Sequence, residues 1–168
     1  TGNIYRLSIG LNPTSGSWFG VGFTKENNLV TDFWDDENND AAPWTLLRKT
    51  RTGSEPLVTR LGPGLDGNVN HANSDTNRWT GSVDLAIELD TRPDLWQVKW
   101  FADDELLRTD NYTANPTIRY VGFGSLSAEG SVDDFQLAIM PQMSSFQQGV
   151  SPDASYSHDA TYFRSNTP

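Results

Sequence analysis

The sequence predicts an all-β domain built from two packed antiparallel sheets, a sandwich or a barrel. Apolar residues recur at every second position in several short stretches, which is the period of a half-buried strand. Clusters of Gly, Pro, Asn, Asp and Ser separate these stretches, and no window keeps a helical apolar period over three turns. A series of about ten short strands with turn signals between them is typical of this fold class.

The clearest strands lie between Ser82 and Thr109. Apolar residues alternate with polar ones over 83–89 and again over 96–100, and a polar turn with a proline separates the two runs. Asp103-Asp104 begins a second reversal. We therefore predict a three-stranded antiparallel meander whose centre strand places its two tryptophans on the core face.

The remaining strands carry weaker patterns. The first two are expected to form an opening hairpin around a turn cluster, and the acidic segment 26–42 and the turn-rich segment 62–77 are expected to be loops. The predicted strands outside the meander are 4–11, 18–24, 44–49, 57–61, 117–124 and 132–139. We expect a single sandwich domain over 1–140, followed by a polar tail over 141–168 that is either a linker or an outer strand.

Composition limits the partners. The 168 residues suit one domain, and the absence of cysteine excludes disulfides and zinc-thiolate sites. A net charge of -10 argues against nucleic acid and anionic membranes as partners. No apolar run approaches the roughly 20 residues needed to cross a bilayer, so no membrane insertion is expected. Because the chain begins at Thr1, we expect a processed product or a domain tethered to others in a longer protein.

A series of segments resembles the concanavalin A-like lectin and glucanase superfamily: S-V-D-L-A-I-E-L-D-T from Ser82, then W-Q-V-K-W-F-A-D-D-E-L-L-R-T, N-P-T-I-R-Y-V-G-F-G and S-V-D-D-F-Q-L. Specifically, it is similar to the non-catalytic laminin-G-like or jelly-roll modules of bacterial polysaccharide-degrading and surface proteins. The resemblance covers about residues 4–140 and departs at Asp103-Asp104-Glu105, where a glycine is expected. It implies a jelly-roll sandwich and a lectin-like, carbohydrate-binding module of a secreted or cell-surface protein.

Catalysis is the main alternative, because the same superfamily includes glucanases with an E-x-D-x-E strand. Asp84, Glu88 and Asp90 share one face, but Ala86 stands where the middle carboxylate should be. Glu88 and Asp90 could reach the carboxyl separation of about 5–9.5 Å that glycoside hydrolysis uses. We expect a solvated outer face and no enzyme; a glycoside hydrolase, a polysaccharide lyase or a laminin-G-like adhesion module are the alternatives.

Crowded oxygen ligands suggest calcium. The acidic segment contributes the candidates Asp32, Asp35, Asp36, Glu37 and Asp40, and a solvated acidic loop is the alternative. In sandwich modules of the similar family, an aspartate at the start of the last strand commonly joins a structural calcium site, which implies Asp133 as a further ligand. By alternation we expect Asp133 to lie on the core side of the sheet's rim, together with Phe135, Leu137 and Ile139.

Sugar binding requires an aromatic face and planar polar side chains. The chain has six tryptophans, more than the core requires. Trp34 and Trp44 border the acidic segment and Trp79 follows an Asn-rich passage, so we expect an exposed platform among these three. The polar candidates beside them are Arg48, Asn70, His71 and Arg78. The predicted partner is therefore a polysaccharide or another glycan.

Overall fold

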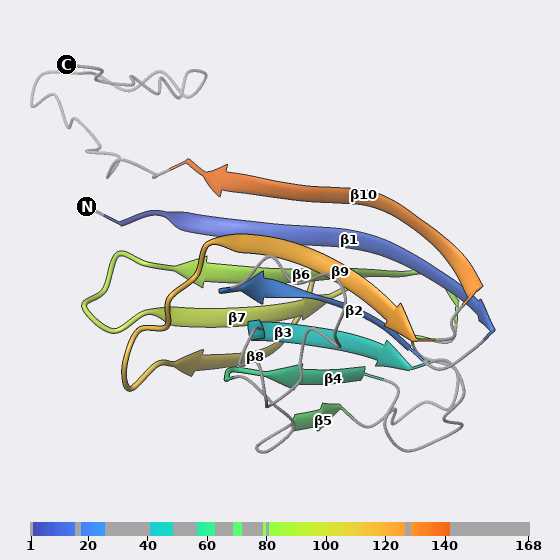
Figure 1. Cartoon of the computed structure of the whole chain (residues 1–168), viewed down its shortest axis with the longest axis horizontal. Coiled ribbons are helices and arrows are strands. Elements are labelled where there is room, and N and C mark those ends of the chain that lie inside the picture. Colours follow the sequence, from blue (N-terminus) through green and yellow to red (C-terminus); the bar gives the residue numbers. More distant parts are fainter. Residues whose placement is uncertain are drawn as a thin grey trace, which may run out of the picture.

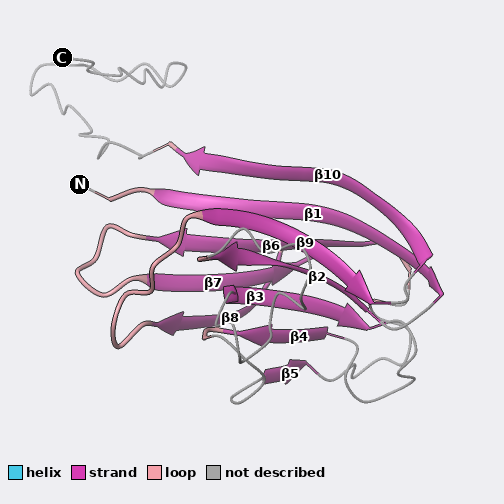
Figure 2. Cartoon of the chain, viewed as in Figure 1, coloured by secondary structure: helices cyan, strands magenta, loops and turns pink. Residues whose placement is uncertain are grey.

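The computed structural model describes residues 2–15, 18–25, 41–48, 57–62, 69–71, 79, 81–126 and 129–141. These residues form ten strands and no helix, and hence no helix that could span a membrane (Figures 1 and 2). The strands make two five-stranded sheets in which neighbours run antiparallel. The predicted all-β class and two-sheet antiparallel sandwich are confirmed, whereas the jelly-roll topology stays a prediction.

Each sheet combines consecutive strands with strands from distant parts of the chain. Sheet A has the order β10 (Glu129–Met140), β1 (Ile4–Ser15), β6 (Val83–Asp90), β7 (Gln97–Ala102) and β8 (Glu105–Asn111). Sheet B has the order β5 (Val69–His71), β4 (Leu57–Arg60), β3 (Ala41–Arg48), β2 (Trp18–Thr24) and β9 (Tyr120–Leu126). The last strand ends at the predicted domain boundary, and the predicted tail beyond Pro141 lies outside the described residues.

The core fills the space between the sheets. In β6 the alternate residues Val83, Leu85, Ile87 and Leu89 are at most 2% exposed. Trp100 of β7 is fully buried, and its Nε1 donates a hydrogen bond to the backbone oxygen of a residue in sheet B, Trp44, at 3.1 Å. The predicted meander is confirmed as β6, β7 and β8, and its central tryptophan connects the two sheets.

The turn between β7 and β8 forms without the glycine that is expected at this position. Asp103 and Asp104 have φ angles of 50° and 61°, the left-handed values of a two-residue type I′ hairpin. Aspartate tolerates this region better than most residues. The Asp84 amide donates to Oδ1 of Asp103 at 2.9 Å, so the first turn carboxylate also fixes the loop against β6.

The predicted opening hairpin is wrong. β1 pairs with β6 and β10 in sheet A, whereas β2 pairs with β3 and β9 in sheet B. Alternation predicts which face of a strand is buried but not which strand lies beside it, and β1 continues through the turn cluster to Ser15. The expected loops also contain strand residues, since β3 begins at Ala41 and β5 occupies 69–71.

Candidate functional site

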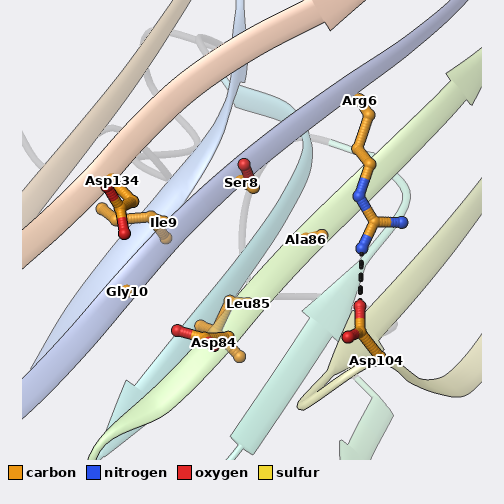
Figure 3. A pocket seen from close by; sticks show the side chains of 9 residues that line it. All are labelled: Arg6, Ser8, Ile9, Gly10, Asp84, Leu85, Ala86, Asp104 and Asp134. Atoms are coloured by element: carbon orange, nitrogen blue, oxygen red, sulfur yellow. Dashed lines mark hydrogen bonds and ion pairs between the residues drawn. The ribbon is translucent and has the colours of Figure 1, made fainter. Parts of the chain in front are cut away.

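A small pocket lies on the outer face of sheet A, across β10, β1 and β6 (Figure 3). Its floor is formed by Ser8, Gly10 and Ala86, which alternate with core residues on their strands. The pocket holds about 220 Å³. This is below the roughly 300–1,000 Å³ of pockets for drug-sized ligands, so it suits one small polar group or a part of a longer ligand.

Glycine at position 10 keeps the floor open. A Cβ atom there would lie 3.2 Å from Oδ1 of Asp84 and 3.4 Å from the backbone oxygen of Asp133. Figure 3 shows the Asp84 and Asp134 side chains on neighbouring strands on the two sides of β1. A single added methyl group would therefore occupy the space between these oxygens.

One arginine is held rigidly at the rim. Nη1 of Arg6 contacts Oε1 of Glu88 at 2.8 Å, and Nη2 contacts Oδ1 of Asp104 at 3.1 Å. The guanidinium also lies over the ring of Phe101, 5.0 Å from its centroid. The Asp104 side chain is 94% exposed, so its ion pair contributes little stability, and its main effect is orientation. The pocket thus presents an oriented cation among three aspartates, Asp84, Asp104 and Asp134.

Two carboxylates of β6, Glu88 and Asp90, are each bound by an arginine. Glu88 is bound by Arg6, while Asp90 accepts hydrogen bonds from Nε and Nη2 of Arg92 at 2.8 and 2.6 Å. The Arg92 side-chain hydrogen bond is the main cause that lowers the pKa of Asp90. A general acid in glycoside hydrolysis needs a raised pKa, so Asp90 is unsuited to that role.

The predicted tryptophan platforms are not exposed within the described part of the chain. Trp44 is fully buried and Trp79 is 7% exposed, so neither ring offers a free face to a sugar. Trp44 packs with Trp18, Leu46 and Val58 in a second apolar cluster, separate from the main core that contains Trp79. On β3, Trp44 and Leu46 lie on the face opposite to Leu47, which belongs to the main core. Trp34 lies outside the described residues.

Three of the four polar candidates for ligand binding belong to the other sheet. Arg48 ends β3 and is partly buried, and Asn70 and His71 lie on β5. The structure therefore does not bring them into the pocket on sheet A. Arg78 lies outside the described residues.

The described residues do not supply a calcium site. The candidates Asp32, Asp35, Asp36, Glu37 and Asp40 lie outside them, and among the residues that are described no three His, Asp or Glu side chains gather around one point. Calcium therefore stays a prediction for the acidic segment.

Asp133 does not point toward the core. It is exposed and lies opposite Gly10, whose face is the outer one. The pairing of β1 and β10 shifts between Ser8 and Gly10, and Asp134 has a φ of 49°. This β-bulge adds one residue to β10, so Asp133 and Phe135 lie on opposite faces. The expectation of an inward carboxylate is wrong because alternation does not continue through a bulge.

No protein-family model and no curated protein matches the chain. The resemblance to the concanavalin A-like superfamily therefore stays a prediction from the residues.

Sequence reasoning did not find the pocket itself. Arg6, Ser8 and Gly10 carry no motif, and they meet Asp84 and Asp134 only through strand pairing. The one available signal was the small residue at position 10 in an otherwise alternating strand.

Proposed function

We propose that the chain is a non-catalytic carbohydrate-binding domain of a secreted or cell-surface multidomain protein, and that it binds glycans through the outer-face pocket. The observation that carries this proposal is that Arg6 and three aspartates line one pocket above a floor of small residues. Carboxylates accept hydrogen bonds from vicinal hydroxyls, and a guanidinium donates two in a fixed geometry. The low floor lets a sugar ring approach the backbone. The resemblance to jelly-roll modules points in the same direction.

The charge of the pocket favours neutral glycans. The pocket is lined by three aspartates and by one arginine, which is already bound to Glu88 and Asp104. The whole chain carries a net charge of -10, so an acidic polysaccharide would be repelled at long range. A neutral sugar is attracted by hydrogen bonds without that penalty.

The binding proposal predicts a loss of affinity in two pocket variants. Asp84→Asn removes charge-assisted hydrogen bonds, and Gly10→Ala fills the floor, so each should weaken binding about tenfold or more. Isothermal titration against a panel of neutral and acidic polysaccharides measures the effect. Asp94→Asn is the matched control, because Asp94 is an exposed aspartate in the turn beyond the other end of β6.

The controls separate binding from folding. Asp94→Asn should bind like the parent chain, and thermal melts should show that all three variants are folded. Absence of binding to every polysaccharide tested, or equal weakening by Asp84→Asn and Asp94→Asn, would count against the pocket.

The melting temperature with and without calcium tests whether the chain binds this ion. If the acidic segment holds calcium, adding the ion at about 100 times its Kd should raise the melting temperature by about 5–10 °C, and chelator should reverse the rise. The double substitution Asp35→Asn and Asp36→Asn should abolish the rise, whereas Asp94→Asn should keep it. A melting temperature that is independent of calcium and chelator would remove the metal from the proposal.

A further inference from the structure

One side of the sandwich exposes apolar side chains that point inward. β10 and β9 are the edge strands on this side (Figure 1). The rings of Phe123 and Phe135 meet edge to face across it, with centroids 5.2 Å apart. We define the open-edge strip as four residues of these strands with exposures of 40–62%: Phe123, Phe135, Leu137 and Ile139.

The open-edge strip continues the apolar core, but its side chains remain exposed. Leu137 lies opposite Leu7, which is fully buried, and Phe123 lies opposite Val21, which is also fully buried. Opposed residues in a sheet point to the same face. The strip therefore faces inward, as alternation predicts, and it is exposed because β10 and β9 have no further neighbour among the described residues.

The second half of β10 lacks the features that usually protect an edge strand, because the charges and the β-bulge lie in the first half. Natural edges are short or carry charges, Pro or Lys. The edge strands β5 and β8 follow this rule, since β5 has three residues and β8 carries Glu105, Arg108 and Asp110. β10 has twelve residues, and its second half, 135–140, reads F-Q-L-A-I-M without a charge or a proline.

We propose that β10 pairs with β10 of a second copy of the chain, antiparallel around a two-fold axis, to form one continuous ten-stranded sheet. Inward residues must oppose inward residues, so one residue must lie directly opposite its own copy, with the axis midway between the two. An axis at Leu137 sets Leu137 against its own copy and Phe135 against Ile139. It sets Asp134 against Met140, so no two carboxylates face each other.

The charge pattern of β10 favours a second copy as the partner, paired in this register. The acidic residues of β10 all lie in its first half, at 129, 133 and 134. Two identical strands can therefore pair through their uncharged halves, which are apolar on the inward side. The chain's net charge of -10 opposes association at long range, so salt should strengthen the dimer by screening.

Because the chain has no cysteine, single cysteines introduced into β10 can test the register directly. In an antiparallel pair, directly opposed Cα atoms are about 4.5–5.5 Å apart, which matches the roughly 4.4–6.8 Å of a disulfide. Leu137→Cys should therefore form a disulfide-linked dimer of the 168-residue chain under mild oxidation. Ile139→Cys should not link to itself, because the two sulfur positions are about 13 Å apart along the strand. A mixture of Ile139→Cys and Phe135→Cys should form the mixed dimer.

Sedimentation measures the equilibrium. The parent chain should dimerise with rising concentration, and the dimer Kd should fall as salt is raised from low to physiological strength. Leu137→Lys should raise the Kd about tenfold or more, by setting two like charges against each other in an apolar strip. Leu106→Lys is the control, because Leu106 is 50% exposed on the opposite edge strand, β8.

Each other outcome overturns the proposal. A chain that stays monomeric at high concentration and high salt has no such interface. Equal cross-linking by Leu137→Cys and Leu106→Cys, or a dimer that Leu137→Lys does not weaken, places the contact elsewhere. A chain that dimerises only after removal of 142–168 assigns the edge to that segment rather than to a second copy.

Discussion

Replacing Trp100 with alanine should lower the free energy of unfolding by about 5 kcal/mol, the largest effect expected of any substitution in sheet A. A buried Trp→Ala change costs about 3–5 kcal/mol by itself. Trp100 is fully buried, and its Nε1 donates to the backbone oxygen of Trp44, so the alanine variant also leaves that acceptor without its donor. A loss of this size approaches the total stability of many domains, which is about 5–15 kcal/mol.

Urea unfolding followed by circular dichroism measures this loss. Trp100→Phe keeps one aromatic ring but removes the pyrrole part of the indole with its Nε1–H, so it should cost less than alanine, about 1–3 kcal/mol. Leu95→Ala is the surface control, because Leu95 is 50% exposed and should change stability by less than about 0.5 kcal/mol. A Trp100→Ala variant within 1 kcal/mol of the parent would show that this tryptophan does not connect the sheets.

Strand faces could be predicted from the sequence because side-chain alternation is a local property. The buried residues of β6 and β7 lie where the pattern placed them, and the turn at Asp103-Asp104 formed without glycine. Strand partners could be predicted only in the meander, where short turns join β6, β7 and β8. The β1–β2 hairpin was wrong because pairing depends on which apolar faces fit together over the whole chain.

The candidate site was less predictable than the fold for the same reason. Arg6, Asp84 and Asp134 come from three strands separated by more than 40 positions each, and only the register of sheet A brings them together. The bulge at Asp134 also reversed the expected direction of Asp133. Sequence reasoning gave weight to tryptophans instead, and the packing of Trp44 and Trp79 shows that aromatic content alone does not distinguish a platform from a core.

The second large effect concerns a glycine in the middle of sheet B. Gly22 on β2 pairs with Trp44 on one side and with Gly122 on the other. A Cβ atom at Gly22 would lie 2.7 Å from Cβ of Trp44 and 2.9 Å from the backbone oxygen of Pro43. Neither contact is with the end of a flexible side chain, so the strands themselves must move apart. Gly22→Ala should therefore lower the free energy of unfolding by about 2–3 kcal/mol.

Gly122 provides a matched control in the same cross-strand pair. A Cβ atom at Gly122 would meet nothing within 4 Å. Gly122→Ala should be neutral or stabilise the protein by up to about 1 kcal/mol, because alanine restricts the unfolded chain. Urea unfolding of both variants then separates two explanations of why a strand carries glycine. A large difference between them assigns the requirement at position 22 to the space taken by Trp44, whereas equal losses would assign it to backbone conformation and contradict the packing argument.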